Sequence, residues 1–577
     1  MKKKFTYAIL FILLPASLLF TGCFGNKTFK IELDQLDNCA IYCDLSEAKA
    51  GEEITLTYDN LSNGYVFEYY TINGEELVGD AFIMPNEDVK VSAVLSKITY
   101  TITYHVDEFT SFVNQNSKLD SYTIGTSASL PQVQKTGYEF DSWYSDSQLQ
   151  NGVEDISSEM YGDLDLYPKF NKLFNVDSST GSITSLTSIA RNKSELKIPE
   201  KIDGVTITTI EANAFTGAIC TTLKISKKIT TFKKDAFAGC YSVKNLYYSG
   251  DLADWVKLSF PSNDEGQISS NPIWWSTSAK VYLNNVLVGE ELVFPDEIKS
   301  VGLNAFYRWG FLKKVKYEGQ LEDWLKITFS TVHSSPLVPV LNQTAGPKLM
   351  INESAVGGDI AIPSTISSIQ PGALAWTNIE TVNLNSSVRY ICDGAFYNCK
   401  LLGNINLIDS QVATIGDYAF YGCIDLKINL PSKLVSIGKY AFAESCKWYG
   451  SESSVVISNY TTTIGVGAFN NCTYLTHVTI GSGLSVIEES CFEGSGLETI
   501  TIPNTINEIG KFAFRGCENL LTVYIKKPYS SNVIKGGEDM FKNTGVTGIY
   551  FEDNEHKNLY QGQTYWNLYT SYFKVVE

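Results

Sequence analysis

One repeated segment constrains the fold of this chain more than any other feature. It reads IGKFAFRGCENL near the C-terminal end, and related segments recur upstream, most of them with an Ala-Phe pair. Successive copies are mostly 22 to 27 residues apart, and two longer steps of 69 and 68 residues are each close to three periods. A period in the low twenties predicts a solenoid, in which every repeat forms one coil of a stack. The repeat phenylalanines are Phe215, Phe237, Phe306, Phe396, Phe420, Phe442, Phe469, Phe492 and Phe514, with Leu374 in place of phenylalanine in one copy and Phe541 in a degenerate copy.

One complete copy, LETITIPNTINEIGKFAFRGCENL, indicates how a coil is built. Ile500 and Ile502 predict a short strand with inward apolar side chains, and Pro503 ends that strand because proline cannot donate to a ladder. We interpret Gly510 as the residue that permits a turn and Phe514 as the side chain that fills the far corner. A coil this thin cannot bury its apolar side chains alone, so stacking on its neighbours must bury them.

Six cysteines follow the same period. A thiol at a buried turn packs as a small hydrophobic group and also hydrogen-bonds to the backbone, so we interpret these residues as structural. Disulfides between adjacent coils are the alternative, whereas zinc requires ligands that converge on one point rather than form a line. Cys240, Cys399, Cys423, Cys472 and Cys517 lie three residues after a repeat phenylalanine and Cys446 lies four after, while Cys220, Cys392 and Cys491 fall outside this register and receive no role.

A longer segment is duplicated as well. YYSGDLADWVKLSF at Tyr247–Phe260 pairs with KYEGQLEDWLKITF at Lys316–Phe329, and each is followed by SNP or SSP and a second strand-like segment. The chain therefore contains a superunit of 69 residues twice, which accounts for both long steps of the repeat.

The recurring I-G-x-x-A-F-x-x-C motif resembles the BspA-type (treponemal) leucine-rich repeats of bacterial surface proteins. The resemblance implies a mainly-β fold, with a leucine-rich-repeat solenoid over residues 173–548 and a C-terminal cap over residues 549–577. We expect Trp566 and Tyr569 to cover the last coil, because an open stack needs a cap to remain soluble. The family resemblance also implies a non-catalytic protein that adheres to host matrix proteins or to other bacteria.

The N-terminal segment MKKKFTYAILFILLPASLLFTGC has a basic start, an apolar run and small residues, which is the layout of a secretory signal. Its ending LFTGC resembles a bacterial lipobox, although Phe20 stands where leucine is usual. This resemblance implies that residues 1–22 are a lipoprotein signal peptide and that Cys23 becomes acylated; an ordinary cleaved signal is the alternative. Acyl chains on Cys23 would hold the exported protein at the membrane of the bacterial cell.

Two small β-rich modules are predicted between the signal and the solenoid, at residues 23–97 and 98–172. The second resembles the Listeria–Bacteroides repeat, a β-grasp-like module, through Gly137, Tyr138, Phe140, Trp143 and Tyr144. Aromatic residues at these alternating positions indicate the core of the module itself. The first module is a more divergent relative, and both are interpreted as spacers, with a sugar-binding aromatic platform as the alternative.

Cys39 and Cys43 lie four residues apart in the first module. In an exported protein they form a local disulfide or remain free thiols, while a lone CxxxC pair is a weak signal for a metal.

Composition limits the partners of this chain. The net charge is −18, and such a surface repels nucleic acid and anionic lipid headgroups. The four histidines, His105, His333, His477 and His556, are far apart, and the sequence contains no G-x-S-x-G, HExxH or P-loop motif. We therefore expect no enzymatic activity, no cofactor and no metal.

The sequence predicts an exported, lipid-anchored, monomeric binding protein that presents an extended repeat surface to an extracellular protein or glycan ligand. Its contact with the membrane is through the N-terminal lipid, and its ligand-binding residues are not predicted. The alternative is a glycan-binding or glycan-processing lipoprotein that uses exposed Trp274, Trp275 and Trp309. That alternative requires these tryptophans to line one solvated cleft beside two close carboxylates.

Overall fold

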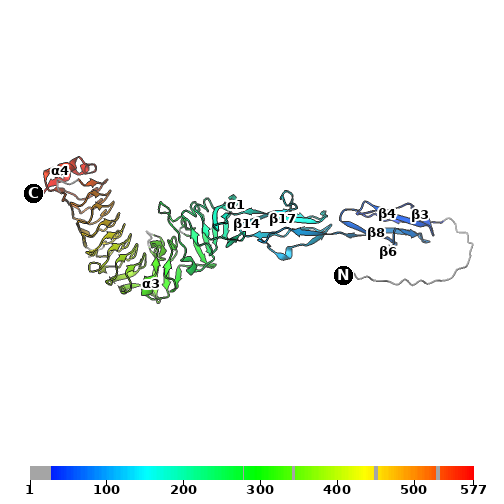
Figure 1. Cartoon of the computed structure of the whole chain (residues 1–577), viewed down its shortest axis with the longest axis horizontal. Helices are drawn as coiled ribbons and strands as arrows, with labels where there is room; N and C mark the ends of the chain where they lie inside the picture. Colours follow the sequence, from blue (N-terminus) through cyan, green and yellow to red (C-terminus); the bar gives the residue numbers. More distant parts are fainter. Residues whose placement is uncertain (1–26, 277, 341–344, 448–452, 528–532, 577) are drawn as a thin grey trace, which may run out of the picture. The chain divides into compact units, whose positions relative to one another are not determined.

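A computed structural model of the chain describes residues 27–576 except 277, 341–344, 448–452 and 528–532. The predicted signal peptide and Cys23 lie outside the described residues. Short β-strands dominate, and the predicted mainly-β fold class is confirmed (Figure 1). In the described part of the chain the α-helices are α1 (Ser188–Arg191), α2 (Leu252–Trp255), α3 (Leu321–Lys326) and α4 (Asn554–Gln561), and the 3-10 helices are η1 (Gln115–Ser117), η2 (Val332–Ser334) and η3 (Trp566–Tyr572).

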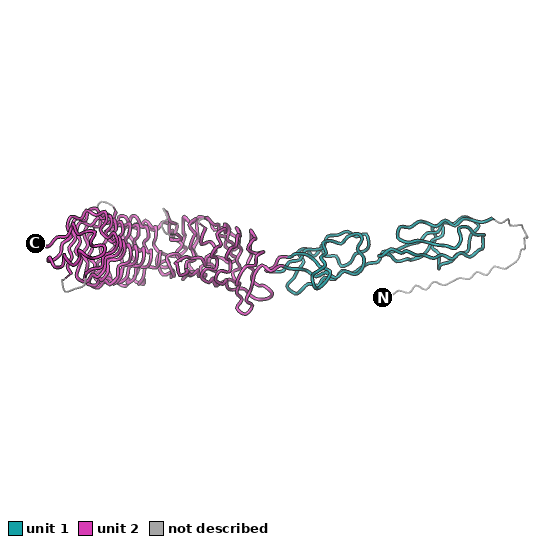
Figure 2. Tube along the Cα trace, turned by 90° about the horizontal axis from the view of Figure 1, so that it is seen from above, with its two compact units in different colours: residues 1–135, 140–170 teal, residues 136–139, 171–577 magenta. Residues whose placement is uncertain are grey.

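The chain divides into two compact units (Figure 2). The first comprises residues 1–135 and 140–170, and the second comprises residues 136–139 and 171–577. The first unit contains two separate hydrophobic cores, so each predicted β module buries its own apolar side chains.

The first core is enclosed by two sheets. In one the strand order is β3-β1-β8-β5-β6, and in the other it is β2-β4-β7. Ile54, Leu56 and Val91 are fully buried between them, which fits the alternation of apolar and polar residues in these strands. The strands are β1 (Thr28–Leu33), β2 (Ala40–Cys43), β3 (Glu47–Lys49), β4 (Glu53–Asp59), β5 (Tyr65–Ile72), β6 (Glu75–Leu77), β7 (Ala81–Ile83) and β8 (Val89–Lys97).

The second core lies on a five-stranded sheet of order β11-β9-β17-β14-β15. Trp143 is buried there and donates from Nε1 to the carbonyl oxygen of Pro131 at 2.7 Å. Tyr138 does not belong to this core as predicted: it packs against the core of the second unit, and its hydroxyl hydrogen-bonds to Asp203. The strands are β9 (Thr99–Tyr104), β10 (Thr110–Phe112), β11 (Ser121–Thr123), β12 (Ala128–Ser129), β13 (Val133–Lys135), β14 (Tyr138–Tyr144), β15 (Gly152–Val153), β16 (Asp155–Ile156) and β17 (Leu164–Lys172).

The second unit is a solenoid with one continuous hydrophobic core from Phe174 to Tyr569. Within each main sheet the strands of successive coils pair in parallel, in a register that places Leu196, Leu223, Leu246 and Val281 side by side in the core of the first sheet. The main strands are β20 (Glu195–Ile198), β24 (Thr222–Ile225), β26 (Asn245–Tyr248), β27 (Lys280–Leu283), β29 (Glu291–Phe294), β31 (Lys314–Tyr317), β33 (Lys348–Ile351), β35 (Gly357–Ala361), β37 (Asn378–Asn383), β39 (Asn404–Ile405), β42 (Ser453–Ile457), β44 (Leu475–Ile480), β46 (Thr499–Ile502), β48 (Thr522–Ile525) and β50 (Gly548–Phe551).

Shorter strands on another side of the coils form further, mostly parallel, sheets. They contain the Ile of the I-G motif, such as Ile415, Ile437 and Ile509, and these side chains are buried. The strands are β18 (Phe174–Asp177), β19 (Ser182–Leu186), β21 (Lys201–Ile202), β22 (Val205–Thr206), β23 (Thr209–Ile210), β25 (Thr231–Phe232), β30 (Ser300–Val301), β32 (Thr328–Phe329), β36 (Ser368–Ile369), β38 (Tyr390–Ile391), β40 (Thr414–Ile415), β41 (Ser436–Ile437), β43 (Thr463–Ile464), β45 (Val486–Ile487), β47 (Glu508–Ile509) and β49 (Lys535–Gly536).

The repeat phenylalanines form a ladder through the C-terminal half of the solenoid. From Phe396 to Phe541, rings in adjacent coils stack with centroids 5.2 to 5.5 Å apart and planes within 12° of one another. The backbone follows the same order, because the amide of Phe420 donates to the carbonyl of Ala441 in the next coil at 2.7 Å. Phe215, Phe237 and Phe306 are also buried, although Phe215 and Phe237 meet at 42°.

The duplicated superunits have matching structures. In the first, Trp255 donates from Nε1 to the carbonyl of Ala305 at 2.9 Å, and in the second Trp324 donates to the carbonyl of Ala373 at 2.7 Å. Each superunit also contains one coil without an Ala-Phe pair, where the carbonyl of Ser269 accepts from the amide of Phe237. The carbonyl of His333 has the same role in the second copy.

The superunits interrupt the main sheet, which a uniform spiral would keep continuous. β28 (Val286–Leu287) pairs antiparallel with β27, and β34 (Ser354–Ala355) pairs antiparallel with β33, so each hairpin occupies a sheet edge that the next parallel strand would need. These two hairpins separate the sheets of order β20-β24-β26-β27-β28, β29-β31-β33-β34 and β35-β37-β39. A third break, outside the superunits, separates the last of these from the sheet of order β42-β44-β46-β48-β50-β51. The hydrophobic core continues across these breaks.

The C-terminal segment covers the last coil, as predicted for Trp566 and Tyr569. Trp566 is fully buried and donates to the carbonyl of Ile534 at 2.8 Å, and the hydroxyl of Tyr569 accepts from the amide of Phe541 at 3.2 Å. Residues 548–551 still form a main strand, so the solenoid extends into the range expected for the cap. The final strand, β51 (Phe573–Val575), adds in parallel to β50.

Replacing Phe420 by alanine should lower the free energy of unfolding by roughly 3–5 kcal/mol, because the ring is fully buried between two stacked neighbours. Urea unfolding followed by circular dichroism measures the change. The matched control is Tyr460→Ala, which removes a largely exposed ring from the same solenoid. An unfolding midpoint for Phe420→Ala equal to that of the control would contradict the phenylalanine ladder as a source of stability.

Candidate binding surface

The outward positions of the first main sheet form an ordered polar column. In β20, β24, β26 and β27 the side chains alternate between the core and solvent. The register places Lys197 beside Lys224, Lys224 beside Tyr247 and Tyr247 beside Tyr282. We call these four outward residues the lysine-tyrosine column.

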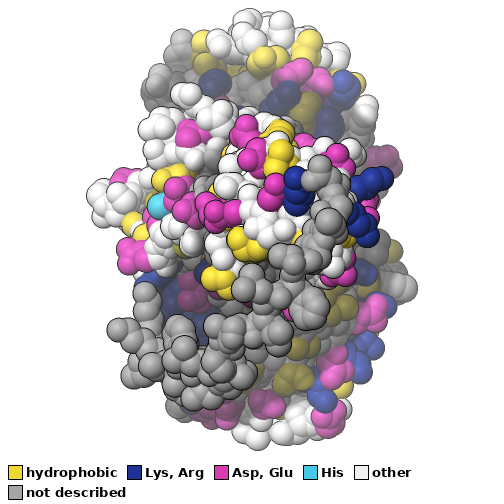
Figure 3. All heavy atoms as spheres, turned by 90° about the vertical axis from the view of Figure 1, so that its right-hand side faces the viewer, with side chains coloured by type: hydrophobic (Ala, Val, Ile, Leu, Met, Phe, Trp, Pro, Cys, Tyr) yellow, Lys and Arg dark blue, Asp and Glu magenta, His cyan; other side chains and the backbone are white. Residues whose placement is uncertain are grey.

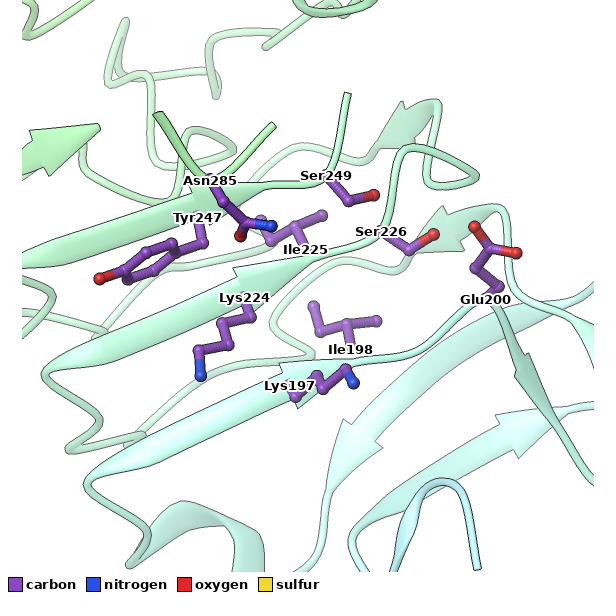
Figure 4. A pocket seen from close by; sticks show the side chains of 9 residues that line it. All are labelled: Lys197, Ile198, Glu200, Lys224, Ile225, Ser226, Tyr247, Ser249 and Asn285. Atoms are coloured by element: carbon purple, nitrogen blue, oxygen red, sulfur yellow. The ribbon is translucent and has the colours of Figure 1, made fainter. Parts of the chain in front are cut away.

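A shallow groove lies along one part of this column, at the carboxyl ends of its strands (Figure 4). Its volume is about 560 Å³. Buried Ile198 and Ile225 form the base, and polar groups dominate the rim. The lining residues are Lys197, Ile198, Glu200, Lys224, Ile225, Ser226, Tyr247, Ser249 and Asn285.

The two lysines of the column have different surroundings. The Lys224 ammonium pairs with Glu195 at 2.5 Å and lies 5.7 Å from the centroid of the Tyr247 ring. Among the described residues, Lys197 has no ion pair. The rings of Tyr247 and Tyr282 stack with their centroids 4.1 Å apart. The hydrogen bond between their hydroxyls raises the pKa of Tyr247. The groove therefore presents two ammonium groups, the carboxylate of Glu200 and the phenol of Tyr247.

Lysine also predominates at the outward positions of the next main sheet. Together the two sheets have six outward lysines and two outward glutamates, although the chain as a whole is strongly acidic. By contrast, the face drawn in Figure 3 mixes acidic, basic and apolar side chains. The outward lysines are Lys197, Lys224, Lys280, Lys314, Lys316 and Lys348, and the glutamates are Glu195 and Glu291.

The three tryptophans proposed for a glycan cleft do not form one. Trp309 is fully buried and Trp274 is nearly so, where it donates to the carbonyl of Phe237 at 2.9 Å. Only Trp275 of the three is exposed, beside Tyr241. This arrangement corrects the prediction, because the superunit core needs large aromatic side chains to fill it.

The four histidines are dispersed through the fold. Nε2 of His105 lies 2.7 Å from Oδ1 of Asp165. His477 lies near Glu498 on the surface, and His556 lies in the first turn of α4. His333 is half-buried, and the loss of solvent around its ring lowers its pKa. In the described part of the chain, no three His, Cys, Asp or Glu residues are placed to hold a metal ion.

The periodic cysteines form a hydrogen-bonded ladder beside the phenylalanines. Cys399 donates to the carbonyl of Leu374 at 3.0 Å, and Cys423 donates to that of Phe396 at 3.1 Å. Cys472 and Cys517 make the same bond to the preceding coil, and Ser445 replaces the thiol where Cys446 is displaced by one residue. Burial raises the pKa of Cys399 and of Cys517 to about 11.

The remaining cysteines fill several other positions. Cys39 and Cys43 are free thiols, and Cys43 donates to the carbonyl of Leu45 at 2.6 Å. Cys491, to which the sequence assigned no role, is buried directly before Phe492, where most coils have alanine. Alignment on the phenylalanines would have identified this substitution.

None of the described helices has both the length and the apolar character needed to cross a bilayer.

Comparison with known protein families gives two matches, one over the solenoid and one over the second β module. The BspA type leucine-rich repeat region matches six copies within residues 170–264, 357–449 and 445–564, which together exceed half of the sequence. The Listeria-Bacteroides repeat domain matches residues 100–169. A search among curated proteins gives no match.

Several solved structures are similar to this chain. A leucine-rich cell surface protein of Faecalibacterium prausnitzii is 19% identical over 67% of this chain and 94% of its own, with a TM-score of 0.32. A leucine-rich repeat protein of Bacteroides ovatus is 17% identical over 70% of this chain and 98% of its own, with a TM-score of 0.29. The pneumococcal vaccine antigen PcpA is 14% identical over 69% of this chain and 92% of its own, with a TM-score of 0.31.

The ladder thiols should resist alkylation at pH 8 in the folded protein. Burial and a raised pKa keep Cys399, Cys423 and Cys517 protonated, and only the thiolate reacts rapidly. Mass spectrometry after iodoacetamide treatment should find these residues modified only when urea is present. Partly exposed Cys43 is the internal control that reacts without urea. Rapid modification of the ladder thiols in the native protein would contradict a purely structural role.

Proposed function

The chain belongs to the BspA-type leucine-rich repeat family, and from this premise we propose that it is a lipid-anchored surface protein that binds an extracellular protein or glycan ligand. Its solenoid supplies the binding surface, and adhesion to host or bacterial ligands is its function. The observation that carries this proposal is the lysine-tyrosine column on the outer face of the first main sheet. The apolar side chains of the coils are buried between stacked coils. Ligand contacts are therefore left to the outward side chains of the strands.

The N-terminal region supports the proposed anchorage. The apolar run of the signal and the lipobox-like ending at Cys23 are features of the sequence, and they precede two modules with their own cores. Each module buries its own apolar side chains, as a spacer requires. In this proposal the lipid holds the chain at the membrane, and the modules extend the solenoid away from the bilayer.

Of the two proposed ligand classes, the composition of the groove favours a glycan. Ser226, Ser249 and Asn285 place hydroxyl and amide groups beside Lys197 and Tyr247. Such groups pair with the hydroxyls of a sugar. Glycan processing has no comparable support, because the three tryptophans do not form the expected cleft.

Cys23→Ser should release the protein from the cell. Acylation requires a thiol at this position, so the variant should lose labelling by an alkyne analogue of palmitate and should move from the membrane fraction to the medium. Cys43→Ser is the matched control, because it removes another N-terminal cysteine and should leave both readouts unchanged. If Cys23→Ser remained in the membrane fraction, the lipid anchor would be wrong.

The binding function is tested with the full chain on arrays of matrix proteins, glycans and fixed bacterial cells. We expect saturable binding of the wild type to at least one ligand. The Phe420→Ala variant should lose this binding under conditions that unfold its solenoid but leave the wild type folded. The Phe420→Ala arm distinguishes the solenoid from the N-terminal modules as the site of binding. Absence of binding to every ligand would remove adhesion as the function.

A further inference from the structure

We propose that the lysine-tyrosine column and its groove bind an anionic polysaccharide. This inference rests on the proposed binding function and specifies the chemical class of its ligand. The site comprises Lys197, Lys224, Tyr247 and Tyr282 on adjacent strands, with Ser226, Ser249 and Asn285 at the rim of the groove.

The charges of the column are not balanced within the protein. Lys197 and Lys224 are directly opposite each other in adjacent strands, and like charges in this arrangement destabilise a sheet. Glu195 pairs with Lys224, whereas Lys197 has no ion pair among the described residues. An anionic group bound between the two ammonium groups would remove this repulsion, which gives the site a physical preference for negative charge.

The spacing of the column suits a polymer better than a single ion. Paired strands lie about 4.8 Å apart, so the four residues of the column extend over about 14 Å. The second main sheet also has more outward lysines than outward glutamates, with Lys314 and Lys348 at directly paired positions, and of these two Lys314 pairs with Glu291 at 3.4 Å. A linear ligand with charge on successive units would meet a cation on several coils.

The groove has the chemistry of a polyol site rather than of a protein interface. Protein interfaces depend on apolar or aromatic anchors in desolvated pockets. Here Ile198 and Ile225 are almost fully buried in the solenoid, and the faces of Tyr247 and Tyr282 are turned toward each other. Besides the two lysines and the carboxylate of Glu200, the lining has serine hydroxyls, an asparagine amide and the phenol of Tyr247, and these groups donate to and accept from sugar hydroxyls.

Another groove of the solenoid also has two lysines beside a stacked tyrosine pair, Tyr397 and Tyr421, but its Lys447 is paired with Glu444 and its Tyr397 ring is fully buried. The outward positions of β35 and β37 include Asp359 and Glu380, and those of β46 include Thr499 and Thr501. A stacked tyrosine pair does recur at Tyr524 and Tyr550, with Lys574 near the second ring. At that pair one lysine contacts a ring among the described residues, so we place the site on the first main sheet, where two lysines line one groove.

The experiment measures binding of the full chain to polygalacturonate and to dextran sulfate by biolayer interferometry. Dextran is the neutral control and poly-L-glutamate is the acidic polypeptide control. We expect at least one charged polysaccharide to bind more tightly than both controls, with affinity that falls as salt rises. Lys197→Gln combined with Lys224→Gln should weaken that binding by roughly 10- to 100-fold, because two charge-assisted contacts are lost.

The matched control variant is Lys233→Gln combined with Lys234→Gln, which removes the same charge next to β25, in a different sheet. Its affinity should stay within about twofold of the wild type, because exposed charges at a distance are screened by salt. Thermal unfolding of both double variants verifies that the solenoid remains folded.

Three outcomes would overturn the inference: equal affinity for poly-L-glutamate, equal affinity for dextran, or equal weakening by the two double variants. Failure of both charged polysaccharides to bind would also overturn it. If the chain then bound another ligand in the array screen, the proposed binding function would stand without this ligand class. If it bound nothing, both proposals would fall together.

Discussion

The structure depends on one constraint: a single coil cannot bury its own apolar side chains. Every coil is closed above and below by its neighbours, through stacked rings such as those of Phe420 and Phe442 and through backbone bonds from one coil to the next. Two consequences follow from this arrangement. The ends of the stack need protection, which Trp566 and Tyr569 give at the C-terminal end, and the apolar residues of the coil are unavailable for ligands.

The periodic features of the fold could be predicted from the sequence because stacking imposes them on every copy. The strand over Thr499–Ile502, its end before Pro503 and the burial of Phe514 all follow from one repeat. The interpretation of Gly510 as the residue that permits a turn was wrong. A Cβ atom there would lie 2.5 Å from the amide nitrogen of Glu489, so this glycine allows close contact between coils rather than a turn.

Other features could not be predicted because they depend on contacts between distant segments. Trp255 lies in a segment that lacks the Ala-Phe pair, and Trp309 lies three residues after Phe306, where several coils have cysteine. The burial of both rings depends on how the superunit closes over them. Tyr138 lies within the sequence of the second module but packs on the solenoid. The binding surface was also hidden, because Lys197, Lys224 and Tyr247 are separated by more than twenty residues each and become neighbours only through the strand register.

Net charge and local charge therefore lead to different conclusions for this protein. A net charge of −18 argues against anionic partners when it is averaged over the chain, and the sequence supports that view for nucleic acid. Charges separated by more than about 10 Å are largely screened at physiological salt, so a ligand on the first main sheet responds chiefly to the nearby lysines. A solenoid makes such segregation easy, because each coil contributes outward side chains to a fixed column without changing the core. Coils whose core side chains must match can therefore differ in their outward side chains. In this chain the outward lysines are concentrated on the first two main sheets.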